Sequence, residues 1–190
     1  MRAALVLSGG LVLMCAVAQG ASGQNLVSNP GFETGDFTGW SLSGITSNTG
    51  VDNSTVHSGS LAAYLGQVGG TGDLFQTLAT TPGTTYTFSF WLENDGGVPS
   101  SFEADWNGSS VFTLTNPDGF DYTLYSFSEL ATGPSTEIDF IVQQDPAYFN
   151  LDDISVATAG VVPEPASMWL LATGLVGMAG LRRRRRTVTS

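Results

Sequence analysis

The middle of the chain, from about residue 24 to residue 160, consists of short stretches in which apolar and polar residues alternate. The segment YTFSFWLEN, from Tyr86, and the segment TEIDFIV, from Thr136, both follow this pattern. Successive side chains of a strand point to opposite faces, so a period of two predicts strands with one buried face. The same pattern predicts strands over 61–66, 74–79, 122–130 and 148–156. The predicted core residues include Phe88, Phe90, Ile138 and Phe140.

A hairpin is predicted where FEADW and SSVFTLT flank Asn107-Gly108, because these two residues adopt the positive φ angles of a type I′ turn. Helical signals are poor, since Gly, Ser, Thr and Asn are abundant and lysine is absent. Roughly eight to ten short strands, each with one apolar face, predict an all-β fold with one antiparallel β-sandwich of the jelly-roll type. The first hairpin arm alternates two sets of side chains, Phe102, Ala104 and Trp106 against Glu103 and Asp105.

The first 23 residues have the three regions of a secretory signal peptide: a charged start at Arg2, an apolar run to Ala18 and small residues beyond. Cleavage after Ala18 or after Gly23 fits equally well. The alternative, a membrane-spanning helix, requires a longer apolar run. We expect export by the Sec machinery and removal of this segment by signal peptidase. The only cysteine, Cys15, leaves with it, so no disulfide is expected in the mature protein.

The last segment, residues 161–190, combines two prolines, an uncharged run over 166–181 and a cluster of arginines. The uncharged run predicts a short transmembrane helix, and a buried core helix is the alternative. Positive residues beside such a helix stay on the cytoplasmic side. We therefore interpret the cluster as a topological stop, formed by Arg182, Arg183, Arg184, Arg185 and Arg186.

Charge separates the middle of the chain from its two ends. The six basic residues are Arg2 and the terminal cluster, whereas all of the 17 acidic residues except Glu164 lie between residues 24 and 160. A domain without Lys or Arg cannot displace counterions from phosphates, which excludes nucleic-acid binding. Divalent cations such as Ca²⁺, which prefer oxygen ligands, would relieve the repulsion among these carboxylates.

The tail resembles the PEP-CTERM sorting signal, in which a Pro-Glu-Pro triplet precedes a short apolar helix and a terminal arginine cluster. Here the triplet is Pro163, Glu164 and Pro165. The resemblance implies recognition by an exosortase, a membrane protease or transpeptidase of Gram-negative bacteria with exopolysaccharide and biofilm gene clusters. It also implies an inner-membrane-anchored precursor, whose helix and arginines are removed when the protein moves to the cell surface or matrix.

The middle resembles the galactose-binding-like β-sandwiches, which include many carbohydrate-binding modules. The residues that carry the likeness are NLVSNPGFETGDFTGW from Asn25, HSGSLAAYLG from His57, PGTTYTFSFW from Pro82 and LDDISV from Leu151. In those domains a structural calcium often joins the start of the domain to its last strand. The resemblance places the metal ligands at Glu33 and Asp152, with Asp153 as the alternate and a backbone carbonyl near His57.

Sugar rings stack on exposed aromatic side chains, and four such residues are candidates: Trp91, Trp106, Tyr122 and Tyr148. We take Trp91, Trp106 and Tyr148 as the predicted ligand-binding residues, against the alternative that they fill the core. A catalytic role is not expected. His57 is the only histidine and has no nucleophile motif beside it, and paired acids such as Glu103 and Asp105 occur on any acidic strand.

The sequence therefore predicts a signal peptide over 1–23, a sandwich domain over 24–160 and a sorting signal over 161–190. The leading functional hypothesis is an exported, exosortase-processed surface or matrix protein whose sandwich resembles a carbohydrate-binding module and associates with exopolysaccharide. One alternative is a structural or adhesive matrix protein with no defined sugar site. The other is a secreted hydrolase.

Overall fold

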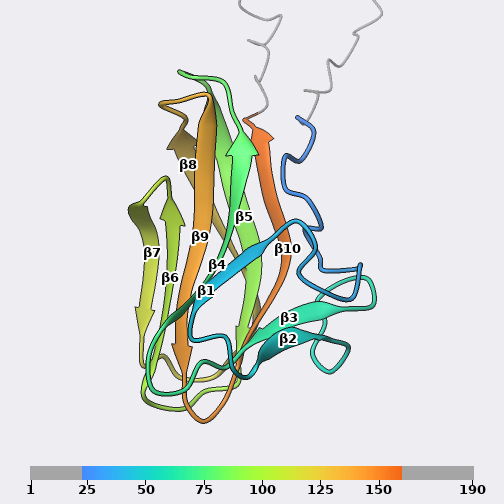
Figure 1. The fold of residues 1–190 in the computed structure, drawn as a ribbon, viewed down its shortest axis with the longest axis vertical. Helices are drawn as coiled ribbons and strands as arrows, with labels where there is room; N and C mark the ends of the chain where they lie inside the picture. The colour runs from blue at the N-terminus through green and yellow to red at the C-terminus, as the bar shows by residue number, and fades with distance from the viewer. Residues whose placement is uncertain (1–22, 160–190) are drawn as a thin grey trace, which may run out of the picture. The chain divides into compact units, whose positions relative to one another are not determined.

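The computed structural model describes residues 23–159, which form ten β-strands and, within that range, no helix (Figure 1). This confirms the predicted all-β class. The strands are β1 (Ser41–Gly44), β2 (Thr49–Asp52), β3 (Ala62–Leu65), β4 (Gly72–Ala79), β5 (Thr85–Asn94), β6 (Ser100–Trp106), β7 (Ser109–Thr115), β8 (Phe120–Leu130), β9 (Ser135–Gln144) and β10 (Phe149–Thr158).

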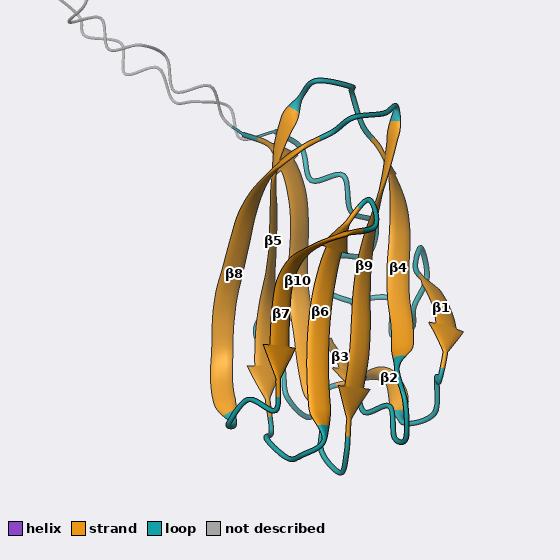
Figure 2. Ribbon diagram, turned by 90° about the vertical axis from the view of Figure 1, so that its left-hand side faces the viewer, coloured by secondary structure: helices purple, strands orange, loops and turns teal. Residues whose placement is uncertain are grey.

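The strands form two five-stranded sheets that pack face to face (Figure 2). Sheet A has the order β1-β4-β9-β6-β7, and sheet B has the order β2-β3-β10-β5-β8. Every strand pair is antiparallel, as the predicted sandwich requires. Consecutive strands mostly lie in different sheets, so the residues that become neighbours on one face come from distant parts of the sequence.

The core lies between the two sheets and is rich in phenylalanine. Phe140 of β9 contacts Phe88 and Phe90 of the opposite sheet, with centroid distances of 5.9 Å and 5.1 Å. It also contacts Phe102 of the neighbouring strand β6, with a centroid distance of 5.8 Å. Ring pairs at such distances stabilise a fold by about 0.5–1.5 kcal/mol each beyond their burial. The four predicted core residues are all fully buried, which confirms the alternation in β5 and β9: Phe88, Phe90, Ile138 and Phe140.

The predicted hairpin joins β6 to β7 through Asn107 and Gly108, whose φ angles are 51° and 74°. Trp106 and Ser109 are the register partners that flank this two-residue turn. Asparagine and glycine tolerate positive φ with little strain, and for this reason the pair determines where the hairpin turns.

The two ends of the described chain lie together at one end of the sandwich (Figure 1). Asn25 fastens the start of the domain to β10, since its Oδ1 accepts from Val156 N (2.9 Å) and its Nδ2 donates to the Ile154 carbonyl (3.0 Å). The Leu26 amide donates to the Val156 carbonyl beside them. The predicted signal peptide, Pro-Glu-Pro triplet, transmembrane helix and arginine cluster lie outside the described residues. Between residues 23 and 159 no helix is long and apolar enough to cross a membrane.

Candidate functional site

Asp152, one of the predicted metal ligands, lies on β10 at the centre of sheet B and is fully buried. Its Oδ2 accepts from the amides of His57 (3.0 Å) and Ser58 (3.1 Å), and its Oδ1 accepts from the amide of Asp153 (2.7 Å). Burial raises the pKa of this carboxyl group, and the three N–H donors oppose that rise. The carboxylate therefore anchors the loop that contains His57 to the last strand.

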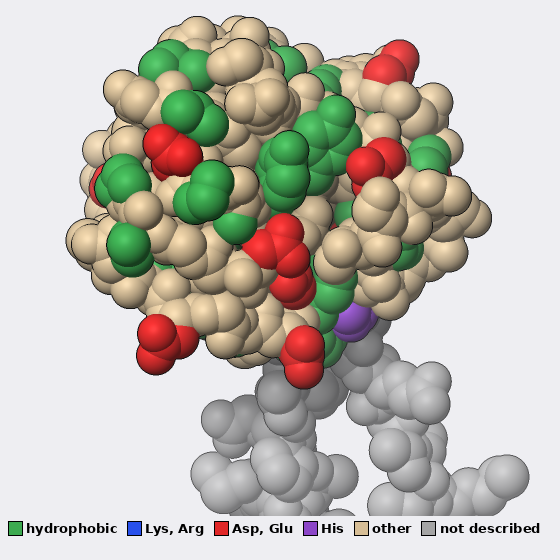
Figure 3. Space-filling view, turned by 90° about the horizontal axis from the view of Figure 1, so that it is seen from below, with side chains coloured by type: hydrophobic (Ala, Val, Ile, Leu, Met, Phe, Trp, Pro, Cys, Tyr) green, Lys and Arg blue, Asp and Glu red, His purple; other side chains and the backbone are tan. Residues whose placement is uncertain are grey.

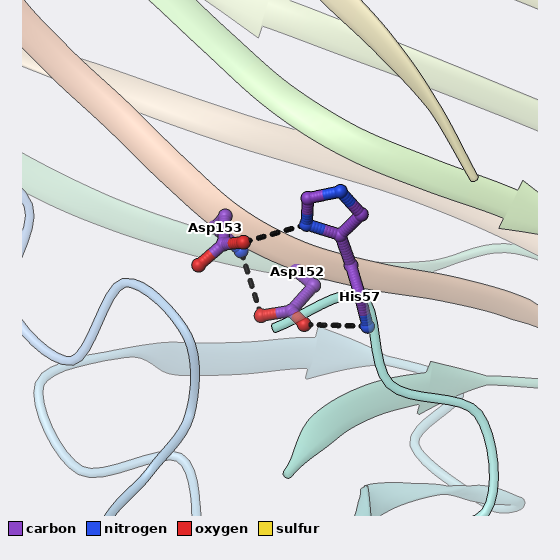
Figure 4. A group of neighbouring side chains, drawn as sticks. All are labelled: His57, Asp152 and Asp153. Carbon is purple, nitrogen blue, oxygen red and sulfur yellow. Dashed lines mark hydrogen bonds and ion pairs between the residues drawn. The ribbon is translucent and has the colours of Figure 1, made fainter. Parts of the chain in front are cut away.

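Asp153 reaches the same loop because β10 is irregular between Asp152 and Ser155 and Asp153 has a φ of 48°. Its Oδ2 lies 2.7 Å from His57 Nδ1, and its Oδ1 accepts from Ser58 Oγ (2.9 Å). Figure 4 shows the Asp153 carboxylate beside the imidazole ring and the Asp152 carboxylate next to the His57 backbone nitrogen. Within the described residues this His57–Asp153 contact is the one pairing of a basic group with an acidic one.

Glu33, the other predicted ligand, contacts the far side of this loop. Its Oε1 accepts from the amides of Ser60 (2.8 Å) and Leu61 (3.1 Å). Gly31 lies between the two groups of acids: a Cβ there would be 3.2 Å from Asp152 Oδ1, 3.5 Å from Asp153 Oδ1 and 3.9 Å from Glu33 Cγ. The three predicted carboxylates therefore surround one short segment of chain.

The donor set suits a calcium ion in its chemistry, because three carboxylates supply oxygen atoms from two sides of the loop. The tighter group consists of His57, Asp152 and Asp153, each with one ligand atom within 4.8 Å of the others, and Glu33 lies outside that group. Asp152 accepts three backbone N–H groups and Glu33 accepts two, so Asp153 is the one of the three acids whose side chain has no backbone N–H donor among the described residues. A bound ion would lie nearest Asp153 and Asp152.

The predicted ligand-binding aromatics lie in three different environments. Trp106 is 4% exposed, belongs to the core cluster and donates from Nε1 to the Leu130 carbonyl, so its prediction as a sugar-stacking residue is wrong. It shares the inward face of β6 with Phe102, and burial follows from that alternation. Trp91 lies on the outer side of β5, but the His57 ring stacks on it with a centroid distance of 3.8 Å.

Tyr148 is 37% exposed and lines a pocket of about 300 Å³ at the outer side of sheet B. Sequence reasoning missed the second aromatic wall of this pocket, Tyr64 on β3, because only the strand register brings the two rings together. The tyrosines meet edge to face, with centroids 5.5 Å apart. The complete lining is Asp52, Ser54, Thr55, Tyr64, Asp95, Tyr148 and Asn150.

The outer face of sheet A has a different character, because cross-strand pairing concentrates acids there. One row across β4, β9 and β6 is Phe75, Asp139 and Asp105, and the adjacent row is Asp73, Ile141 and Glu103. We call these six residues the acidic face; all are half-buried. The alternation assigns each of them to the outside. The signal that could have marked the face is an apolar residue, Phe75 or Ile141, at such an outward position.

Burial and repulsion both act on the carboxyl groups of the acidic face. Burial, followed by the carboxylates of Asp73, Glu137 and Asp105, raises the pKa of Asp139 to about 7. Burial and Glu103 also raise the pKa of Asp105. The Oδ1 atoms of Asp139 and Asp105 are both buried and have no hydrogen-bond donor among the described residues. Carboxylates only accept hydrogen bonds when ionised, and buried acceptors are normally satisfied. The face therefore suits a ligand that is rich in donors.

Comparison with family models gives two matches. Residues 24–143 match the model described as a carbohydrate binding domain, and residues 161–185 match the PEP-CTERM protein-sorting motif. Both resemblances found in the sequence are thereby confirmed. A search of curated proteins found no match.

Several solved structures with a similar fold are carbohydrate-binding modules. TmCBM61, solved in complex with β-1,4-galactotriose, has a TM-score of 0.59 and 21% identity over 72% of this chain and 99% of its own. A family 16 module has a TM-score of 0.52 and 20% identity, over 70% and 99%. The CBM22-1 xylan-binding domain from Paenibacillus barcinonensis Xyn10C has 0.54 and 14%, over 74% and 98%. At these identities the likeness shows the shared fold.

Proposed function

The chain belongs to the carbohydrate binding domain family, and from this premise we propose that it is an exported surface protein whose acidic face binds a neutral, hydroxyl-rich glycan. The observation that carries the proposal is the pair of buried, donor-less oxygens on Asp139 and Asp105. Sugar hydroxyl groups donate hydrogen bonds, and an ionised acceptor, which Asp139 becomes above about pH 7, strengthens such a bond to about 1.5–3 kcal/mol. The hydroxyl groups of a glycan would therefore supply the hydrogen-bond donors that these two oxygens lack among the described residues.

The apolar residues of the acidic face support the same proposal. Phe75 lies next to Asp139 in the cross-strand register, and Ile141 lies between Asp73 and Glu103. An apolar surface flanked by a few polar groups is typical of ligand sites, in which the apolar part provides contact area and the polar groups fix orientation. The C–H side of a sugar ring would pack on Phe75 while its hydroxyl groups reach the carboxylates. Uronic-acid polysaccharides would be repelled.

The sorting motif supports export and processing. We propose that an exosortase acts at Pro163, Glu164 and Pro165, that Arg182 to Arg186 hold the precursor at the inner membrane, and that the host is a Gram-negative bacterium. The last strand, β10, ends at Thr158, only a few residues before this triplet. After processing at this triplet, only a few residues would connect the sandwich to its anchor. The proposed location is the exopolysaccharide layer of the cell surface or biofilm.

A structural Ca²⁺ at the loop of residues 57–61 belongs to the proposal. Asp153 and Asp152 would hold it, and Glu33, on the other side of the loop, is the further ligand that the family resemblance assigns. An ion there would neutralise part of a domain that has no Lys or Arg between residues 24 and 160. It would supply charge compensation and rigidity, and no chemistry.

The test is glycan binding by the sandwich domain, residues 24–160, measured by affinity electrophoresis and calorimetry against neutral β-glycans and the host's own polysaccharide. We expect Asp139→Asn and Phe75→Ala each to weaken binding about tenfold or more, which corresponds to about 1.4 kcal/mol. The matched controls are Asp118→Asn and Leu124→Ala, which change an exposed acid and an exposed apolar residue elsewhere. Equal affinity for all five proteins would refute the proposed face.

Two other functions would give different results in the same experiment. A structural matrix protein is favoured by the uncompensated carboxylates. It would bind no glycan and would associate when Ca²⁺ is added, as measured by light scattering. A hydrolase would release reducing ends from the glycan. The facing carboxylates of Asp105 and Asp139 would then be its acid pair, and Asp139→Asn would abolish the release.

A further inference from the structure

The pocket on the outer side of sheet B is built around two tyrosine rings that depend on glycines. Gly50 pairs with Tyr64 across β2 and β3, and a Cβ at Gly50 would lie 2.4 Å from Tyr64 Oη. A Cβ at Gly66 would lie 2.5 Å from Tyr148 Cε1. Neither glycine has a positive φ, so their lack of a side chain is explained by the space that the rings occupy. The Tyr64 ring packs against the backbone of Gly50 and the Tyr148 ring packs against the backbone of Gly66, which restricts both rings.

The polar walls of the pocket are also fixed by the fold. The Asp95 amide donates to the Tyr148 carbonyl (3.0 Å), which joins the end of β5 to the loop before β10. Asp52 Oδ1 accepts from the Ser54 amide (2.8 Å) at the end of β2. Asn150 is buried and donates from Nδ2 to Glu93 Oε2, behind the pocket. The aromatic rings therefore share the pocket with the carboxylates of Asp52 and Asp95, and hydrogen bonds fix the positions of these two residues.

The charge around this pocket is entirely negative. Asp52 and Asp95 line it, and burial raises the pKa of Glu93, with Asp95 and Asp121 adding to the rise. Seen from below, the sandwich shows acidic and hydrophobic side chains and a histidine, and no Lys or Arg among the described residues (Figure 3). Carboxylates attract cations by their charge, and neighbouring aromatic faces attract them by cation–π interaction. A neutral sugar would gain neither the charge attraction nor the cation–π interaction.

We propose that this pocket binds the protonated amino group of an amino sugar, as a second carbohydrate site separate from the acidic face. The ammonium group would lie between Asp52 and Asp95 over the tyrosine rings, with Ser54, Thr55 and Asn150 available to sugar hydroxyl groups. The two sites lie on different sheets. A chain that holds both could bridge a neutral glycan and a partly de-acetylated, cationic one.

The experiment is an NMR titration of the ¹⁵N-labelled sandwich domain, residues 24–160, at about pH 6, where primary amines are protonated. The probes are the glucosamine trimer, which has free amino groups, and the N-acetylglucosamine trimer, in which the same groups are acetylated and uncharged. We expect the glucosamine trimer to shift the amides of Tyr64, Tyr148 and Asn150 and to bind about tenfold more tightly than the acetylated trimer. Raising NaCl from about 20 mM to about 300 mM should weaken it.

Variants separate the pocket from general charge. Asp95→Asn and Tyr148→Ala should each weaken glucosamine-trimer binding about fivefold or more, whereas Asp118→Asn removes the same charge outside the pocket and should leave it unchanged. Phe75→Ala should also leave it unchanged, so this test and that of the acidic face fail independently. The amino-sugar site is refuted if both trimers bind the sheet B pocket equally, if the glucosamine trimer shifts only amides of sheet A, or if spermidine binds the pocket as tightly as the glucosamine trimer.

Discussion

The carboxylates on the two outer faces of the sandwich differ in their hydrogen bonding. On sheet B, Asp152 is completely buried and accepts three backbone N–H groups. On sheet A, Asp139 is only half-buried, yet its Oδ1 has no donor among the described residues and its pKa rises to about 7. A buried acid with donors holds the fold together, whereas an acid without donors weakens it. Such a cost is typical of a position that serves a ligand.

The largest effect is expected from Asp152→Ala, which should destabilise the sandwich by about 3 kcal/mol. The change leaves the part-buried amides of His57 and Ser58 without their acceptor and detaches their loop from β10. Urea denaturation of the domain measures the difference. Asp153→Asn is the control, since the Asp153 side chain hydrogen-bonds only side chains of that loop and asparagine tolerates the φ of 48° at this position, so it should cost less. A smaller loss for Asp152→Ala than for Asp153→Asn would contradict the anchoring role.

The next effect concerns the proposed calcium ion. Ca²⁺ at about 100 times its Kd should stabilise the sandwich by about 2.7 kcal/mol, and EDTA should remove this gain. Asp153→Asn should abolish the response and Glu33→Gln should weaken it, whereas Asp73→Asn on sheet A should keep it. Thermal melts with and without Ca²⁺ give the answer. A melting temperature indifferent to both Ca²⁺ and EDTA would remove the metal from the account.

On sheet A we expect a smaller effect of pH. The folded Asp139 retains a proton up to about pH 7, whereas the unfolded carboxyl group loses it near its usual 3.8. Stability should therefore fall as the pH rises from about 4 to about 7. Asp139→Asn should remove this fall and raise stability at about pH 8 by roughly 1 kcal/mol, a figure reduced for solvent screening. Melts at both ends of the window test it, and parallel curves for the two proteins would argue against repulsion at Asp139.

The smallest effect is that of salt. Apart from the His57–Asp153 contact, the described residues hold no pairing of opposite charges, so screening has mainly repulsion to remove. NaCl at about 0.5 M should raise the melting temperature slightly, by less than Ca²⁺ does. The control is a salt series on Asp139→Asn, which should respond less. A melting temperature that falls with NaCl would show that attractive pairs dominate after all.

The sequence predicted the inward half of the fold well and the outward half poorly. Alternation assigned Phe88, Phe90, Ile138 and Phe140 to the core because a strand has only two faces, and Asn107-Gly108 marked its turn because few residues accept positive φ. The same rule, applied strictly, would have buried Trp106. Large aromatics attract a sugar-stacking interpretation, but on β6 this one shares the face of Phe102.

The meeting of outward residues could not be predicted, because it depends on the register between strands that are far apart in sequence. Asp105 and Asp139 face each other only because β6 and β9 pair, and Tyr64 meets Tyr148 across the sheet from a distant loop. The family resemblance compensated for part of this gap at Glu33, Asp152 and Asp153, which do surround one loop. It gave no information on the acidic face or on the tyrosine pocket.

The central claim is that a neutral glycan binds the acidic face, and the direct measurement is amide chemical-shift mapping of the sandwich domain with a neutral oligosaccharide that the binding assays select. The account predicts that the largest shifts fall on β4, β9 and β6, around Phe75, Asp139 and Asp105, and that they vanish in Phe75→Ala. Shifts confined to sheet B, or their persistence in that variant, would contradict it.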